Sequence, residues 1–225
     1  MNITAIIPAA GSGSRYSTVK NKLTENLSGV PVIIRTLQKI SAADKINNII
    51  ICTSIDLLDE IKKLAEEHNI SKAKDIVLGG KTRQESVFLG LKEAEKYNPD
   101  YVLIHDGARP LVSGEIIENS INAAVKKGAA IAAVPAKDTI KKVNPDTGEI
   151  VKTLNRSELW NVQTPQVFKF RAVLGAHESL KNSDFTDDAA LLEEMKIPVF
   201  VVEGSYKNIK ITTEEDLKIA KTLIE

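Results

Sequence analysis

A segment near the start of the chain, from Pro8 to Arg15, has the residue types of an anion-binding loop. It reads Pro-Ala-Ala-Gly-Ser-Gly-Ser-Arg, and its small residues allow backbone N–H groups to approach a phosphate closely. A Walker loop would need Gly-Lys-Ser/Thr, and a dinucleotide fingerprint would need a third glycine where Tyr16 stands. We therefore expect a phosphate loop outside both motifs, with a plain strand–helix turn as the alternative.

The connection that follows these glycines is unusually long. Helical periodicity does not appear until about Val30, and connections longer than about 12–15 residues in compact domains are usually functional or disordered. Arg15, Lys20 and Lys22 lie within it. Such a group of cations is suited to binding a polyphosphate.

Two later segments place polar groups after short apolar runs. Gly79-Gly80 is followed by Arg83 and Ser86, and Asp106 is followed three residues later by Arg109. An aspartate at the end of a strand can hold a ribose hydroxyl or Mg²⁺, and an arginine can grip a phosphate through two parallel hydrogen bonds. A local salt bridge between Asp106 and Arg109 is the alternative. Counting the Pro8–Arg15 loop, such groups follow three of the expected strands, which favours a binding site.

Further polar residues come late in the chain. Thr186-Asp187-Asp188 supplies hydrogen-bond acceptors, and Lys210 stands between apolar neighbours. An ammonium group in that setting must reach a polar partner, either in the site or at a solvated edge. His105, beside Asp106, is expected to be a core or capping residue.

The elements that must position these residues alternate between short apolar runs and amphipathic stretches. This rhythm predicts a single α/β domain over residues 1–225, a Rossmann-like three-layer sandwich with a mostly parallel sheet. Ligands of such sheets bind beyond the carboxyl ends of the strands. The expected strands are 3–8, 46–53, 76–78, 101–105, 129–135 and 199–202. The expected helices include 31–42, 56–68, 115–127, 170–180 and 186–195.

The rhythm breaks between residues 137 and 158. Two β-prone runs, 139–143 and 150–154, flank the turn sequence Asn-Pro-Asp-Thr-Gly, which indicates a β-hairpin. A lone hairpin is marginally stable in water, so we expect this arm to pack on something else. A partner subunit is the favoured hypothesis, and folding back onto its own domain is the alternative.

Composition excludes several classes of function. Lysine plus arginine equals aspartate plus glutamate at 30 each, so no net field draws the chain onto nucleic acid or a membrane. No apolar run approaches the roughly 20 residues of a membrane span, and the start of the chain lacks a signal-peptide pattern. A single cysteine, Cys52, stands in an apolar run and is expected to be a packed thiol. We expect a cytoplasmic protein.

Together these residues resemble the 2-C-methyl-D-erythritol 4-phosphate cytidylyltransferases of isoprenoid precursor synthesis, over nearly the whole chain. Beyond the segments already described, the likeness includes Asp138-Thr139-Ile140-Lys141, Trp160 with Gln163-Thr164-Pro165-Gln166, and Asn208-Ile209-Lys210-Ile211-Thr212. Two positions depart from the family pattern. Asn21 replaces the usual proline before Lys22, and Lys81 stands where an acidic residue is common.

The resemblance implies transfer of a cytidylyl group from CTP to 2-C-methyl-D-erythritol 4-phosphate, with Mg²⁺ or another divalent cation and a homodimer formed through the arm. It assigns catalysis to Arg15, Lys22 and Lys210, with Arg15 and Lys22 on the triphosphate and Lys210 at the α-phosphate. Nucleotide binding falls to Pro8, Ala9, Ala10, Gly11, Ser12, Gly13, Gly80, Arg83, Ser86 and Asp106. Acceptor binding falls to Asp106, Arg109, Thr139, Arg156, Thr164 and Thr186. Thr139, Arg156 and Thr164 would approach the neighbouring subunit's acceptor through the arm, and Asp106 is the candidate Mg²⁺ ligand, although the metal is held mainly through the triphosphate.

Two rival functions stay open at this point. One is a ribitol-5-phosphate cytidylyltransferase, which shares the glycine loop and the Gln-Thr-Pro-Gln segment but typically has a longer acceptor loop. The other is a nucleotide-binding protein without turnover. An oxidoreductase is disfavoured by the missing third glycine.

Overall fold

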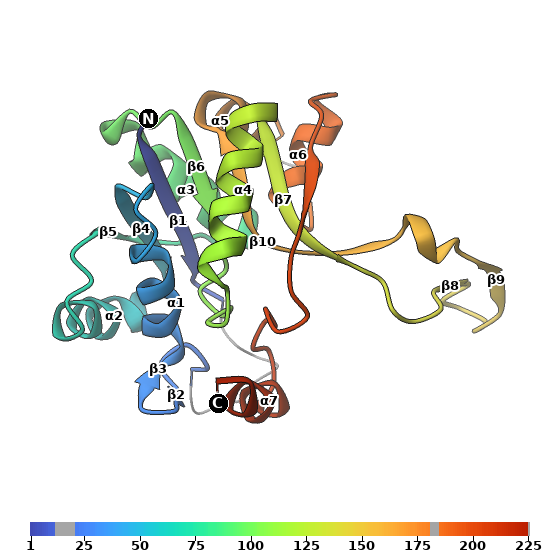
Figure 1. The fold of residues 1–225 in the computed structure, drawn as a ribbon, viewed down its shortest axis with the longest axis horizontal. Coiled ribbons are helices and arrows are strands. Elements are labelled where there is room, and N and C mark those ends of the chain that lie inside the picture. The colour runs from blue at the N-terminus through green and yellow to red at the C-terminus, as the bar shows by residue number, and fades with distance from the viewer. Residues whose placement is uncertain (12–20, 181–184, 225) are drawn as a thin grey trace.

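The chain folds into three layers, with a seven-stranded sheet between two layers of helices, as the computed structural model shows (Figure 1). The structure describes residues 1–11, 21–180 and 185–224. The strand order is β11-β7-β10-β6-β1-β4-β5. β10 runs antiparallel to both of its neighbours, and every other pair in this sheet is parallel. The mostly parallel α/β fold expected from the sequence is confirmed.

The strands of the main sheet are β1 (Ile3–Ala9), β4 (Asn48–Thr53), β5 (Ala73–Leu78), β6 (Tyr101–Ile104), β7 (Ala129–Pro135), β10 (Trp160–Lys169) and β11 (Phe200–Glu203). Two small hairpins pair β2 (Asn26–Leu27) with β3 (Val30–Pro31), and β8 (Lys141–Val143) with β9 (Ile150–Thr153). The helices are α1 (Val32–Ser41), α2 (Ile55–Glu67), α3 (Arg83–Ala94), α4 (Gly114–Lys127), α5 (Phe170–Ser179), α6 (Asp188–Glu194) and α7 (Glu214–Ile224). Single 3₁₀ turns are η1 (Glu95–Tyr97) and η2 (Arg156–Glu158).

The two faces of the sheet bury separate apolar cores. Alternate residues of β1 point to opposite faces, as strand geometry requires. Ile7 packs with α1, α2 and α4, whereas Ile6 packs with α3, α5 and α6. A third, smaller cluster joins α7 to β2 through Leu217 and Leu27. Because helices cover both faces of the sheet, a ligand is expected to bind at the ends of the strands.

One strand of the sheet was not expected from the sequence. Residues 160–169 form β10, the longest strand, between β6 and β7. The run contains Pro165, which lacks a backbone N–H, and the polar Gln163 and Thr164. Its pairing with β7 shifts register between Val162 and Gln166, so the proline falls where the ladder is interrupted. The β2–β3 hairpin, within the long connection after β1, was also missed.

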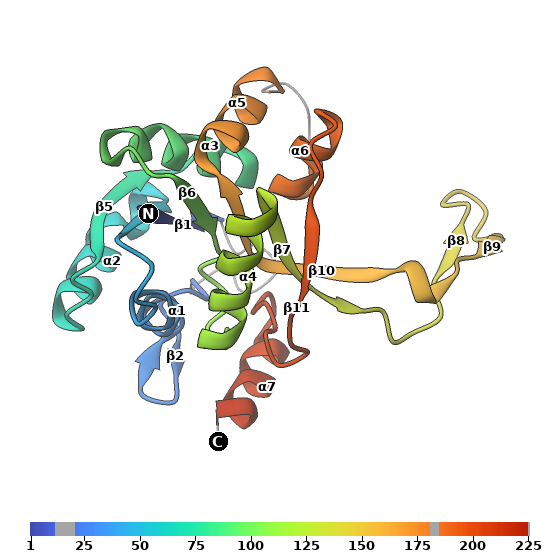
Figure 2. The ribbon, with the colours of Figure 1, turned by 45° about the horizontal axis from the view of Figure 1, so that its top comes forward.

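The β8–β9 hairpin confirms the expected arm. It projects far from the sheet on two extended segments (Figures 1 and 2). All seven residues of the two strands are exposed. The alternative, in which this hairpin folds back onto its own domain, is wrong for this structure.

The structure also bears on the cysteine and on membrane spans. Cys52 is fully buried, and burial raises the pKa of its thiol to about 12, so the expected packed thiol is confirmed. Among the described residues, no helix is long and apolar enough to cross a membrane.

Candidate active site

Two hollows open at the carboxyl ends of β1, β5 and β6, as expected for this fold. The first hollow has a volume of about 490 Å³, and its lining includes Pro8, Ala9, Ala10, Gly11, Lys22, Gly80, Arg83, Ser86, Asp106 and Lys210. The second hollow has a volume of about 440 Å³, and its lining includes Arg83, Asp106, Arg109, Gln163, Thr164, Gln166, Thr186, Asp187 and Lys210. Arg83, Asp106 and Lys210 line both hollows. We call these three residues the shared wall.

Backbone turns form much of the first hollow. Gly79 lies so close to the end of β1 that a Cβ there would approach the Cβ of Ala10 to 2.5 Å, so this position requires glycine. Ser86 Oγ accepts a hydrogen bond from Gly80 N at 3.0 Å and donates one to Thr82 O at 2.9 Å. Thr82 in turn caps α3 by accepting from Glu85 N at 3.0 Å. The serine and the cap therefore fix the turn that lines the first hollow.

Asp106 is the electrostatic centre of the shared wall. Its Oδ1 lies 3.0 Å from Arg83 Nε, and its Oδ2 lies 2.8 Å from Lys210 Nζ. Burial alone would raise the pKa of this carboxyl group, but the charges of Arg83, Lys210 and Arg109 outweigh it and hold the pKa well below its ordinary value. Asp106 is therefore an anion throughout the neutral range, with each oxygen facing a different cation.

Lys210 reaches the site rather than a solvated edge. Its segment follows β11 and lies against the Asp106 loop, where Ile211 N donates to Ala108 O at 2.9 Å. The flanking Ile211 is fully buried, which directs the lysine side chain toward Asp106. An ammonium group has three N–H donors, so contact with Asp106 leaves others to face an anionic ligand.

Arg109 connects the same loop to the Lys210 segment. Its Nη1 donates to Asn208 O at 2.7 Å, whereas its Nε lies 3.8 Å from Asp106 Oδ2. Burial lowers the pKa of this guanidinium, and the neighbouring Asp106 only partly opposes that effect. The local Asp106–Arg109 salt bridge, which was the alternative to a binding role, is the longest of the three ion pairs that Asp106 makes. His105 is fully buried, and its Nε2 lies 3.1 Å from Arg109 O, which confirms the expected core role.

The second hollow is built from side chains of β10 and the turn before α6. Thr164 Oγ1 accepts from Asp106 N at 3.1 Å, and Thr186 also lines this hollow. Thr164 is buried within its own domain. It therefore lies in this chain's own cleft, whereas the resemblance grouped it with residues that reach a neighbouring subunit.

Thr139 and Arg156 lie elsewhere. Both are exposed and line neither hollow. Arg156 Nη1 donates to Lys137 O at 2.7 Å, so it braces the base of the arm. Three other expected site residues, Ser12, Gly13 and Arg15, lie outside the residues that the structure describes.

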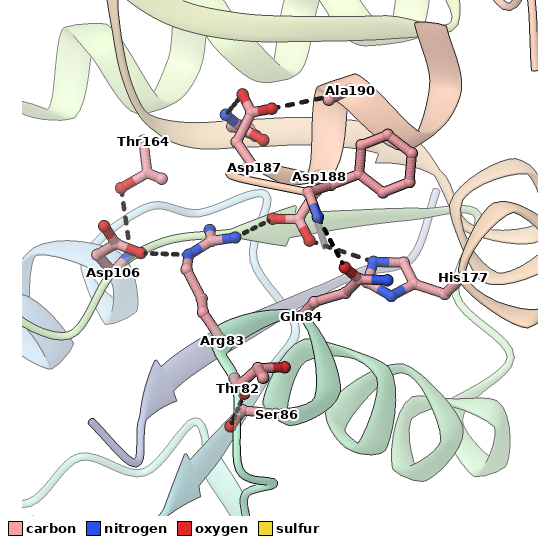
Figure 3. Close-up of polar contacts among 12 residues, drawn as sticks. Thr82, Arg83, Gln84, Ser86, Asp106, Thr164, His177, Asp187, Asp188 and Ala190 are labelled. Atoms are coloured by element: carbon pink, nitrogen blue, oxygen red, sulfur yellow. Dashed lines mark hydrogen bonds and ion pairs between the residues drawn. The ribbon is translucent and has the colours of Figure 1, made fainter. Parts of the chain in front are cut away.

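The structure adds one residue, His177, and several side-chain contacts that the sequence did not single out. Arg83 Nη1 lies 2.7 Å from Asp188 Oδ2, and Asp188 Oδ1 lies 3.1 Å from His177 Nε2 (Figure 3). Gln163 and Asn208 form a second support, because Asn208 Nδ2 donates to Thr164 O at 2.9 Å and to Gln163 Oε1 at 3.2 Å. Asp188 was expected only as a nearby acceptor, and no pattern around His177 marks it in the sequence.

The donor set bears on the expected divalent cation. Within residues 1–11, 21–180 and 185–224, no group of three or more His, Cys, Asp or Glu residues could hold a metal ion. Asp106 offers a single ionised carboxylate at the shared wall. Mg²⁺ commonly takes one or two protein carboxylates together with substrate phosphates. The site therefore fits a cation that arrives with a triphosphate, and does not fit one held by the protein alone.

Comparison with protein families and curated sequences gives one consistent result. The family model described as 2-C-methyl-D-erythritol 4-phosphate cytidylyltransferase matches residues 3–225. A relative of that name from Bacillus licheniformis is 43% identical over 100% of this chain and 96% of its own length. Another of that name from Bacillus cereus is 44% identical over 98% of this chain and 97% of its own length.

Solved structures agree with the sequence comparison. The 4-diphosphocytidyl-2C-methyl-D-erythritol synthase of Anaerococcus prevotii superposes with a TM-score of 0.85 at 37% identity, covering 99% of this chain and 95% of its own. The 2-C-methyl-D-erythritol 4-phosphate cytidylyltransferase of Francisella tularensis superposes with a TM-score of 0.81 at 31% identity, covering 99% of this chain and 100% of its own.

Proposed function

This chain belongs to the 2-C-methyl-D-erythritol 4-phosphate cytidylyltransferase family, and we propose that its reaction takes place at the shared wall between the two hollows. The enzyme joins CTP to 2-C-methyl-D-erythritol 4-phosphate, giving 4-diphosphocytidyl-2-C-methyl-D-erythritol and pyrophosphate. The ribitol 5-phosphate alternative is not favoured. One observation carries the assignment of place: Lys210 Nζ lies 2.8 Å from Asp106 Oδ2, and both residues border both hollows.

The chemistry requires positioning more than proton transfer. The acceptor is a phosphomonoester whose second pKa is about 6, so it is largely dianionic at neutral pH. One of its oxygens forms a bond to the α-phosphorus of CTP while the bond to the leaving pyrophosphate breaks. Because the attacking oxygen carries no proton, no general base is needed. In-line placement and stabilisation of the accumulating negative charge then account for the rate.

We assign the first hollow to the nucleotide. Pro8 to Gly11 and Gly80 bring backbone groups to its surface, which suits a base and ribose, and Ser86 fixes the turn. Lys22 borders the same hollow and is placed to meet the triphosphate, with Arg15 as its expected companion. Mg²⁺ would neutralise part of the triphosphate charge, with Asp106 as its one protein carboxylate.

We assign the second hollow to the phosphorylated polyol. Arg109, Thr164 and Thr186 line it, and they supply a cation and two hydroxyl groups to a ligand that carries a phosphate and several hydroxyls. Asp106 and Lys210 then stand between acceptor and nucleotide, where the new phosphorus–oxygen bond forms. Lys210 is suited to the α-phosphate because its ammonium group faces both hollows.

We also propose a homodimer in the cytoplasm. The exposed arm supports the dimer, since its apolar side chains are not covered by any described residue of their own chain. A second subunit would bring Thr139 and Arg156 toward the acceptor. A buried, unpaired cysteine and the use of a nucleoside triphosphate support the location.

Substituting the two described lysines tests the assignment. Lys22→Ala and Lys210→Ala should each lower turnover by roughly 100- to 1000-fold, by analogy with the loss of one oxyanion donor. Pyrophosphate release with CTP and 2-C-methyl-D-erythritol 4-phosphate is the measurement, with and without Mg²⁺. Lys62→Ala, at an exposed position of α2, is the matched control. Near-normal turnover of both cleft variants would place the reaction elsewhere.

A further inference from the structure

Four side chains form a continuous chain of contacts from the core of the protein to the shared wall. His177 of α5 contacts Asp188 at the start of α6, Asp188 contacts Arg83 at the start of α3, and Arg83 contacts Asp106 (Figure 3). The three distances are 3.1, 2.7 and 3.0 Å. Only the outer two residues, Arg83 and Asp106, border the hollows. The inner pair, His177 and Asp188, lies behind them.

The inner pair is too deeply buried to serve as a surface contact. The side chains of His177 and Asp188 are each 1% exposed. Burial would raise the pKa of the Asp188 carboxyl group, but Arg83 and the hydrogen bond from His177 hold it below its ordinary value. A buried charge needs such partners, and an apolar pair of similar volume is often no less stable. Stability alone therefore does not account for an ionised carboxylate here.

Geometry shows what the inner pair does to Arg83. The guanidinium presents its donors in a rigid fork. Arg83 donates hydrogen bonds from Nε to Asp106 Oδ1 and from Nη1 to Asp188 Oδ2. Held in this way, it takes a single oxygen of Asp106, and the other oxygen is left for Lys210. Without Asp188, the fork would be free to turn and grip both oxygens of Asp106.

Packing keeps the inner pair itself in place. The His177 ring stacks on Phe88, with ring centroids 6.2 Å apart and an interplanar angle of 10°. Next to Arg83, Gln84 Nε2 donates to Leu180 O at 3.2 Å, and Gln84 Oε1 accepts from Phe185 N at 3.3 Å. The start of α3 is thus tied to both α5 and the turn before α6.

We propose that Asp188 and His177 are positioning residues for cytidylyl transfer. His177 orients the Asp188 carboxylate, Asp188 fixes Arg83, and Arg83 restricts Asp106 so that Lys210 keeps its place at the α-phosphate. This inference rests on the proposed reaction centre at the shared wall. In the proposed reaction centre neither His177 nor Asp188 touches substrate, and both act through Arg83.

Asp188→Asn tests the first step, because it removes the charge and keeps the shape. We expect kcat for pyrophosphate release to fall about 10- to 100-fold, since the fork of Arg83 is released, while KM for CTP changes less than threefold. The matched control is Asp75→Asn, which removes a carboxylate that also pairs with a cation, Lys96, and accepts from Tyr97. Asp75 borders neither hollow, so its variant should keep normal kcat.

A double-mutant cycle separates positioning from loss of structure. In an Arg83→Met background, adding Asp188→Asn should change kcat less than threefold, because residues that act through one another are not additive. If the effects of the two substitutions on kcat instead multiply, Asp188 does not act through Arg83 and the proposal is wrong. Thermal melting of each variant shows whether it is folded.

His177 provides a milder and independent test. His177→Gln keeps an N–H donor near the position of Nε2, whereas His177→Leu has none. We expect the glutamine variant to stay within about threefold of the parent kcat and the leucine variant to lose roughly tenfold, as for one hydrogen bond to a charged group. Equal kcat values for the two variants would overturn the proposal.

The lysine variants distinguish the two levels of inference. If Lys210→Ala abolishes turnover while Asp188→Asn retains it, only the positioning role fails. If Lys210→Ala retains turnover, the proposed reaction centre itself fails.

Discussion

The shared wall and the β8–β9 arm differ in how far their polar residues are buried and in which parts of the chain contact them. At the wall, Asp106 is nearly buried and is held by Arg83, Lys210 and the Thr164 hydroxyl. On the arm, every residue of both strands is exposed, and polar contacts within the arm include a hydrogen bond from Lys141 Nζ to Thr153 at 2.6 Å. The wall is held by contacts between distant parts of this chain, whereas the strands of the arm have no comparable cover among the described residues.

This difference shows what each region depends on. Groups at the wall have their geometry fixed before any ligand binds, as charge stabilisation without reorganisation requires. The arm exposes apolar side chains, with Ile150 59% and Val151 58% exposed. A hairpin of that kind gains little stability alone, so its stability in solution is expected to depend on the proposed contact with a second subunit.

The largest expected contrast lies in unfolding stability. Leu91 packs fully buried on α3, the helix that carries Arg83, and Leu91→Ala should lower the free energy of unfolding by about 2–5 kcal/mol. Val151→Ala on the arm should change it by less than about 0.5 kcal/mol in the monomer. Urea unfolding of both variants is the measurement. Comparable losses would mean that the arm belongs to the cooperative unit.

The next contrast is in pH dependence. Burial lowers the pKa of His105 to about 4, whereas an unfolded histidine titrates at about 6.5. Between these values the unfolded chain binds more protons, so stability falls as the pH falls, by up to about 1.4 kcal/mol per pH unit. The arm contains no histidine and should not contribute to this loss.

Urea unfolding between pH 7 and pH 4.5 measures the effect, with His105→Gln as the comparison. Glutamine keeps an N–H donor for the Arg109 carbonyl but does not titrate, and the other two histidines are common to both proteins. The variant should lose less stability on acidification. Parallel stability curves would show that His105 is not the group responsible.

The smallest expected effect concerns self-association. Ile150→Ser with Val151→Ser removes apolar surface from the arm and should weaken the proposed dimer about tenfold, with little change in monomer stability. Sedimentation equilibrium measures the dissociation constant. Lys152→Ser, on the same strand, is the control for a serine substitution that removes no wholly apolar side chain. An unchanged dissociation constant would exclude these two side chains from the contact.

Much of the fold is local in origin, and the sequence predicts it. The five helices for which bounds were expected begin and end within two residues of them, because apolar spacing and caps such as Ser113 before α4 are properties of short segments. The cleft residues at strand ends were found for a related reason. Parallel strands bring their carboxyl ends to one edge whatever lies between them, so Gly80, Asp106 and Lys22 could be grouped before their contacts were known.

β10 was missed because its signal is not local. Its residues include a proline and several polar side chains, and they form a strand only because β6 and β7 leave a space between them. Burial there is decided by neighbours far away in the sequence. The placement of Thr164 in its own cleft follows from the same strand.

The sequence by itself determined the fold class and the kinds of charge at the strand ends, and it predicts a glycine-lined phosphate loop. Only the tertiary structure decided which charges meet, because Arg83 and Asp188 are 105 positions apart and no periodicity connects them. Local patterns specify how a segment folds. Side-chain partnerships across the sheet depend on how the helices pack over it, and that is a property of the whole chain.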